Sequence, residues 1–189
     1  MVLAPLTAAC IAAAAHSYQL PPAYMFAILK TEGGHVGQQV HNTNGTYDLG
    51  PFQINTSWGP AIASFWHIPL AQAIAHVRDN GCANAVIATA ILKKYLIESK
   101  GDYAKAIGYY HSHTEALASV YRKAVLDTVA SFGKPGQPAI NLPQPKYRSP
   151  LVAQPRYISP LGPQPHYISP LGPGTEENIT GKTRVAPSR

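Results

Sequence analysis

The chain has 189 residues and a mass of 20.2 kDa, with 46% hydrophobic and 13% charged residues. This composition is enough for the core of one compact domain and excludes a disordered polyelectrolyte, and no apolar run is bulky enough to span a bilayer. The net charge of +6 is uneven, because residues 1–133 hold 8 Lys+Arg against 7 Asp+Glu while residues 134–189 hold 7 against 2. Since the excess lies in the C-terminal part, a nucleic-acid-binding domain is not indicated.

The first 133 residues have patterns typical of helices. Alanines from Ala8 to Ala15 predict a first helix. A second helix is expected from Pro22 to about Glu32, where Gly33-Gly34 ends it. Residues 35–52 are polar and rich in turn residues, and Asn44-Gly45 indicates a hairpin. We therefore expect a small irregular or β-containing insert within a helical domain.

Helical patterns resume after Asn55 and continue to the end of this region. The nearly apolar segment from Cys82 to Leu96 predicts a buried central helix. A last helix has residues at the spacing of one helix face, namely Leu117, Val120, Tyr121, Ala124 and Thr128. The predicted fold class is therefore mainly α, with a small β component.

Residues 134–189 are expected to form a disordered proline-rich tail. This segment holds 12 of the 18 prolines and repeats with a period of ten, in copies that run over 144–151, 154–161 and 164–171. Proline favours extended polyproline II geometry and no apolar stretch of helical period is present. Two interpretations stay open: a semi-rigid spacer, or a docking ligand with tyrosine, isoleucine and leucine as repeated anchors.

Glu32 is the acidic residue with the most unusual predicted position. It follows Met25, Ile28 and Leu29 at helical spacing and so shares the face that these apolar residues would bury. It also lies in the last turn, where the helix dipole disfavours negative charge. Both effects raise a carboxyl pKa, as a general acid requires. The alternative is an ordinary helix-end glutamate whose side chain reaches water.

Two further motifs follow Glu32 in the chain: Gly50-Pro51-Phe52-Gln53-Ile54-Asn55, and then Tyr110-His111. In this order and spacing, the sequence resembles lytic transglycosylases of the soluble lytic transglycosylase type, which have a lysozyme-like fold. It looks most like the small members that accompany secretion, conjugation and pilus systems. The resemblance covers roughly residues 10–130, which places a transglycosylase domain at 10–133.

The resemblance implies roles for individual residues. Glu32 would be the catalytic acid and then base, cleaving the MurNAc-GlcNAc β-1,4 bond to leave 1,6-anhydroMurNAc ends without a second carboxylate. The expected substrate-binding residues are Gln53, Asn55, Tyr110, Phe52 and His111, with the tyrosine pointing at the catalytic carboxyl. Cys10 and Cys82 would form a disulfide, as in these relatives. The chain departs from the family at Gly33, where a serine usually helps to orient the glutamate, and at Pro51-Phe52, which replaces Leu-Met.

Asp48 is a candidate second carboxylate. If it lay near Glu32, hydrolysis would become feasible, but aspartate is common in turns and we expect a loop residue. We expect no metal and no cofactor, because His35, His41, His111 and His113 do not match a known ligand spacing.

The implied substrate and disulfide predict a location in the periplasm or cell envelope. Met1 to Ala9 is a candidate remnant of a signal peptide, because Thr7-Ala8-Ala9 resembles a small-residue cleavage site. The expected partners are peptidoglycan glycan strands and, through the tail, components of a secretion, conjugation or pilus system; we expect a monomer. The alternatives are a non-catalytic glycan-binding or assembly module and a hydrolase of the goose-lysozyme kind.

Overall fold

The computed structural model of the chain describes residues 3–132. The expectations for residues 134–189, including the three repeats and their polyproline II conformation, lie outside the described residues. Within them, no helix is both long and apolar enough to cross a bilayer.

The described region is mainly helical and includes one small antiparallel sheet, which confirms the predicted fold class. Its elements in chain order are α1 (Ala8–Ser17), α2 (Pro22–Glu32), β1 (Gln39–His41), β2 (Tyr47–Leu49), β3 (Ile54–Asn55), a short 3-10 helix η1 (Thr56–Trp58), α3 (Gly59–Trp66), α4 (Leu70–Asp79), α5 (Gly81–Glu98), α6 (Tyr103–His111) and α7 (Glu115–Ser131).

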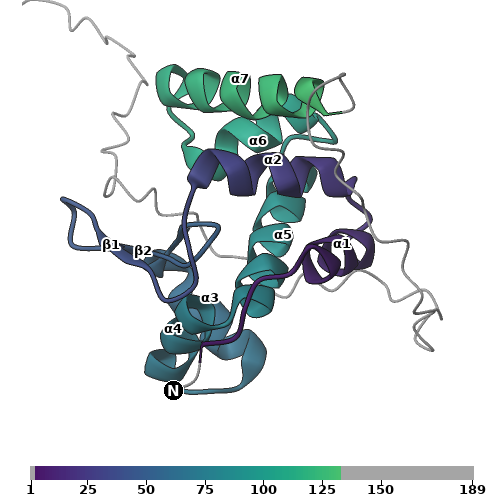
Figure 1. Cartoon of the computed structure of the whole chain (residues 1–189). Coiled ribbons are helices and arrows are strands. Elements are labelled where there is room, and N and C mark those ends of the chain that lie inside the picture. Colours follow the sequence, from purple (N-terminus) through teal and green to yellow (C-terminus); the bar gives the residue numbers. More distant parts are fainter. Residues whose placement is uncertain (1–2, 133–189) are drawn as a thin grey trace, which may run out of the picture.

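Helix α5 is the centre of the domain, as the apolar segment from Cys82 predicted. Helices α2, α6 and α7 gather at one end of it, α3 and α4 lie at the other, and α1 packs alongside (Figure 1). Side chains along α5 such as Ile87, Ala88 and Leu92 are fully buried. This helix therefore joins the two halves of the domain into one hydrophobic core.

The sheet lies beside the helices and follows directly from α2 (Figure 1). Its strand order is β1-β2-β3, and the β1–β2 connection holds the expected Asn44-Gly45 turn, with Gly45 at a φ of 82°. The register places Asp48 of β2 opposite Asn55 of β3. Two residues that are seven positions apart in sequence are thus side by side.

A buried asparagine ties the segment after β2 to the central helix. The amide nitrogen of Asn84 donates to the carbonyl oxygens of Leu49 (2.9 Å) and Val77 (3.0 Å). Its side-chain oxygen accepts from the backbone N–H of Phe52 (2.9 Å). A buried amide with all these groups paired fixes the turn at residues 49–52 in space.

Helix α7 presents a different face to the core from the one that its spacing suggested. Tyr121 is buried, but Leu117 is 47% exposed and Val120 is 72% exposed. The reason is the close packing of α6 and α7: a Cβ on Gly108 would lie 3.1 Å from the Cβ of Ala118. This contact between small residues turns the Ala118 and Tyr121 side of α7 inward.

The N-terminal segment belongs to the folded unit. The backbone N–H of Ala4 donates to Asp79 (2.9 Å), and the N–H of Gly81 donates to Ala4 (2.9 Å). Thr7 caps α1, which begins at Ala8. The predicted domain boundary at residue 10 therefore falls inside a helix, and the interpretation of Met1 to Ala9 as a leader remnant stays a prediction.

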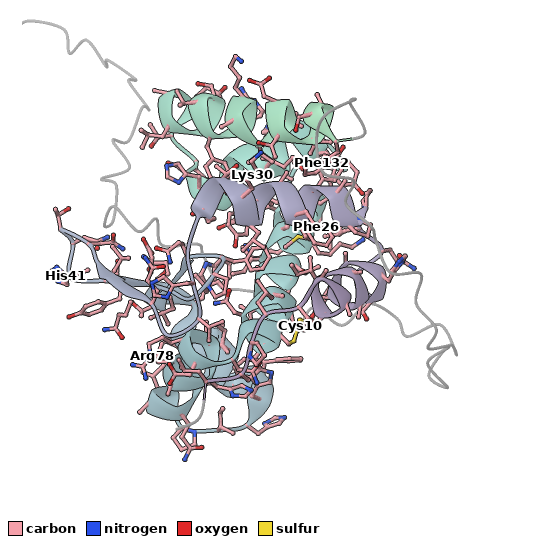
Figure 2. All side chains as sticks on the ribbon, in the orientation of Figure 1. Cys10, Phe26, Lys30, His41, Arg78 and Phe132 are labelled. Carbon is pink, nitrogen blue, oxygen red and sulfur yellow. A yellow bond between two sulfur atoms is a disulfide. The ribbon has the colours of Figure 1, made fainter. Side chains whose placement is uncertain are left out.

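A disulfide links Cys10 of α1 to Cys82 of α5, with the two Cα atoms 5.4 Å apart. Figure 2 shows it beside the label of Cys10, where the two helices meet. The pairing that the resemblance implied is present, and it closes a loop of 72 residues.

Candidate active site

A cleft of about 530 Å³ opens between the end of α2, the sheet, α5 and α6. Six of the seven residues assigned to acid or substrate contacts line it, namely Glu32, Asp48, Gln53, Asn55, Tyr110 and His111. The remaining lining residues are His41, Asn42, Thr43, Asn44, Ile54, Ser57, Trp58, Ile91 and Tyr95. The wall is therefore made of amides, hydroxyls, aromatic rings and two carboxyl groups, the mixture that suits a polar ligand with apolar ring faces.

Glu32 is the last residue of α2 and is partly buried in this cleft. The helix ends there because Gly33 takes a left-handed conformation with a φ of 64°. Burial raises the pKa of Glu32 to about 7; a hydrogen bond from Tyr121 opposes this, and the negative charge of Asp48 adds to it. The carboxyl can thus hold or release a proton near neutral pH.

Tyr121 of α7 is the tyrosine that contacts the glutamate. Its hydroxyl donates to Oε1 of Glu32 at 2.5 Å. Burial raises the pKa of Tyr121 far above its ordinary value, so the hydroxyl keeps its proton. The sequence placed Tyr121 on a helix face and gave it no role in the site. The available signal was that a tyrosine in a core-facing position carries a hydroxyl that needs a hydrogen-bond partner.

Tyr110 was expected to point at Glu32, and this was wrong. Its hydroxyl donates instead to the carbonyl oxygen of Phe52 at 3.0 Å. The rings of Tyr110 and Tyr121 lie roughly parallel, with centroids 6.4 Å apart. Tyr110 therefore forms part of the cleft wall and holds the turn that carries Gln53.

Phe52 was expected to bind substrate, and this too was wrong. Its side chain has no exposed surface and packs in the hydrophobic core. The next residue, Gln53, faces the cleft, has a φ of 47°, and donates from Nε2 to the carbonyl oxygen of Gly50 at 2.7 Å. The tight turn sends the two neighbouring side chains in different directions, so only the glutamine reaches the cleft.

Asn55 lines the cleft but its amide is already engaged. Nδ2 donates to Thr46 Oγ1 (2.9 Å) and to Asp48 Oδ1 (2.8 Å), and Oδ1 accepts from the N–H of Ser57 (2.9 Å). Both amide hydrogens are used, so Asn55 holds Asp48 and the hairpin rather than offering its amide to a ligand. Its expected substrate-binding role stays a prediction, because its side chain still lines the cleft.

Asp48 lies in strand β2 and not in a loop, contrary to expectation. Its side chain lines the same cleft as Glu32, and its charge raises the pKa of that residue. The sequence therefore brings a second carboxylate to the site.

His111 stacks on the tyrosine that bonds Glu32. The ring centroids of His111 and Tyr121 are 4.9 Å apart and the planes differ by 5°. Burial lowers the pKa of His111, and the negative charge of Asp48 opposes this in part. A neutral imidazole beside the cleft is the expected state near pH 7.

Two aromatic residues of the cleft were not expected from the sequence. Trp58 of η1 and Tyr95 of α5 pack edge to face, with ring centroids 6.1 Å apart. Aromatic faces of this kind are common platforms for apolar ring surfaces. Trp58 follows the Gln-Ile-Asn turn by three residues, and this proximity was the available signal.

Within residues 3–132, no group of three or more His, Cys, Asp or Glu side chains gathers as a metal-ligand set. His41 and His111 line the cleft, whereas His113 contacts Glu98 of α5 at 2.9 Å.

Comparison with protein-family models and with curated proteins finds no match for this chain.

Proposed function

We propose that the protein is a peptidoglycan lytic transglycosylase, which cleaves the MurNAc-GlcNAc β-1,4 bond and leaves 1,6-anhydroMurNAc ends. The observation that carries this proposal is Glu32, a partly buried carboxyl with a pKa of about 7 in an open, polar and aromatic cleft. Glycosidic oxygen is a poor leaving group unless an acid protonates it as the bond breaks, and a carboxyl with this pKa is suited to that task near neutral pH.

The proposed reaction uses Glu32 twice. Its protonated form donates to the glycosidic oxygen as the bond to the anomeric carbon breaks, and the bonding electrons go to that oxygen. The carboxylate that remains accepts the proton of the C6 hydroxyl of the same sugar, whose oxygen attacks the anomeric carbon. The glutamate ends in its starting protonation state, and no water is consumed.

The hydrogen bond from Tyr121 supports this use of Glu32. A Cβ on Gly33 would have no atom within 4 Å, and the left-handed backbone there disfavours any side chain. Position 33 is a glycine, so this chain lacks the serine that helps to orient the carboxyl in the family that it resembles. We assign that orienting role to Tyr121, which approaches from α7.

A hydrolase is the second candidate, because Asp48 lies in the same cleft as Glu32. Two-carboxylate glycosidases use the second group as nucleophile or as the base that activates water. The two candidates differ in their products: hydrolysis adds the elements of water to the new end, whereas the transglycosylase leaves an anhydro sugar.

We extend the proposal to location and partners. A disulfide between Cys10 and Cys82 is consistent with an oxidising compartment such as the periplasm. Local opening of the wall by a secretion, conjugation or pilus system, reached through residues 134–189, would use such an activity.

Clearing of a suspension of purified sacculi tests the proposal. We expect the wild type to lower the turbidity and Glu32→Gln to lose at least about 100-fold in rate. Glu115→Gln is the matched control, since its side chain is 72% exposed on α7 and pairs with Arg122 at the surface. Equal clearing by Glu32→Gln and the wild type would contradict the proposal.

A further inference from the structure

Asp48 is held in a defined orientation at the cleft. Strand pairing places it between Val40 of β1 and Asn55 of β3. Asn55 donates to Oδ1 at 2.8 Å, and among residues 3–132 no group donates to Oδ2. Half of this carboxylate is therefore fixed by the protein and the other half remains available to a ligand in the cleft.

The charges around the two carboxyl groups are few. The titratable groups that face them come from four other elements: His41 of β1, Tyr95 of α5, Tyr110 and His111 of α6, and Tyr121 of α7. The described residues that line the cleft include no lysine or arginine. Asp48 thus has no lysine or arginine partner among those lining residues, and in the free protein its charge opposes ionisation of Glu32.

Such an arrangement favours a cation that forms between the two groups. As a glycosidic bond breaks, positive charge develops at the anomeric carbon and the ring oxygen. A carboxylate that is already fixed in the cleft stabilises that charge and needs no rearrangement at the moment of reaction. The same carboxylate stabilises the uncharged bound substrate very little, so it lowers the barrier of the chemical step and affects kcat rather than binding.

We propose that Asp48 is a second catalytic carboxylate, whose charge stabilises the cationic sugar that forms when Glu32 protonates the leaving oxygen. This inference rests on the proposed function. Asp48 forms no bond to the sugar and takes no proton, so the C6 hydroxyl still closes the anhydro ring and Glu32 remains the only acid and base. Asn55 is its positioning residue.

The test compares Asp48→Asn with the wild type on soluble glycan strands, between pH 4 and pH 9. Asparagine keeps the shape and an oxygen acceptor for Asn55 and removes the charge. We expect kcat to fall by about 100-fold with little change in KM. Because the negative charge of Asp48 raises the pKa of Glu32, its loss also moves the alkaline limb of activity to lower pH. Asp127→Asn, which removes an exposed charge of α7, is the matched control and keeps wild-type kinetics.

A second variant guards against a folding defect. In Asp48→Ala, added formate supplies a small carboxylate to the vacated space, and we expect it to restore part of kcat. Formate should not help Glu32→Gln, because a free anion does not replace a proton donor on the leaving oxygen. A purely structural role for Asp48 predicts no rescue.

Each other outcome is decisive. An active wild type with an equally active Asp48→Asn would overturn the role of Asp48 and leave the proposed function standing. A raised KM with unchanged kcat and pH profile would assign Asp48 to binding, and also overturns it. Hydrated products from the wild type would make Asp48 the base that activates water, and no cleavage by the wild type would remove the proposed function and this inference together.

Discussion

The hydroxyl of Tyr121 bonds the carboxyl of Glu32 at 2.5 Å, although the two residues are 89 positions apart in the chain. Helix α2 brings the carboxyl to the cleft, and α7 brings a hydroxyl that keeps its proton. The bond favours the ionised form of Glu32 and so limits how far burial raises its pKa. It also fixes the direction of the carboxyl. Gly33, the next residue, has no side chain that could do this.

Tyr121→Phe should separate these two effects. Without the hydroxyl, the pKa of Glu32 rises further, so the alkaline limb of activity moves to higher pH, while kcat falls by about 10- to 100-fold because the carboxyl is no longer oriented. Phenylalanine keeps the stacking on His111. Rate measurements against pH check this.

Tyr110→Phe is the matched control for that variant. It removes a hydrogen bond to the carbonyl oxygen of Phe52 and leaves the one to Glu32. We expect lower stability, by about 1 kcal/mol, and an unmoved alkaline limb. If both variants moved the limb equally, the Tyr121 hydroxyl would not control Glu32.

Glu32 should also destabilise the folded chain at neutral and alkaline pH. Because burial raises its pKa from 4.5 to about 7, the folded state holds a proton in this window that the unfolded state releases. Stability therefore falls as the pH rises from about 4.5 to 7, and the full cost, up to about 3 kcal/mol, is present above pH 7.

Glu32→Gln removes this cost and keeps an oxygen acceptor for Tyr121. We expect its Tm to exceed that of the wild type by several degrees at pH 8 and to match it near pH 4, where both side chains are neutral. Thermal unfolding followed by circular dichroism at the two pH values measures this. An offset that is the same at both values would show that ionisation of Glu32 is not the cause.

Asn84 should be one of the most sensitive core positions. Its side chain has no exposed surface and makes three hydrogen bonds to backbone groups of the segments around the cleft turn. Asn84→Ala leaves these buried groups unpaired, at a cost of about 3 kcal/mol or more. Asn80→Ala loses one cap bond of α5 and should cost about 1 kcal/mol. Urea unfolding of the two variants gives the comparison, and equal costs would contradict the role of Asn84.

The disulfide should contribute strongly to stability. Its sequence separation of 72 residues implies about 4 kcal/mol from restriction of the unfolded chain. We expect no free thiol in the denatured, unreduced protein, two after reduction, and a lower midpoint of urea unfolding in the reduced form. Two free thiols before reduction would show that Cys10 and Cys82 are unpaired.

Local signals were enough to predict much of the fold. The end of α2 at Glu32, the hairpin at Asn44-Gly45 and the buried helix from Cys82 each depend on propensities and periodicity within a short segment. Glu32 was predictable as a perturbed acid for the same reason, because its helix face and its position in the last turn are both local properties.

The wrong assignments concern side-chain directions that tertiary packing decides. Which tyrosine reaches Glu32 depends on how α7 is rotated, and the contact of Gly108 with Ala118 sets that rotation. The inward direction of Phe52 depends on a turn that Asn84 holds from another helix. Neither contact is visible in the spacing of residues along one segment.

The central claim is that Glu32 cleaves glycan strands without water. Mass spectrometry of the soluble products from purified sacculi, with Glu32→Gln beside the wild type, tests it most directly. We predict muropeptides that lack the mass of one water, present with the wild type and absent with the variant. Hydrated reducing-end products would contradict the account in favour of hydrolysis, and sacculi that are bound but not cleaved would contradict it in favour of a glycan-binding module.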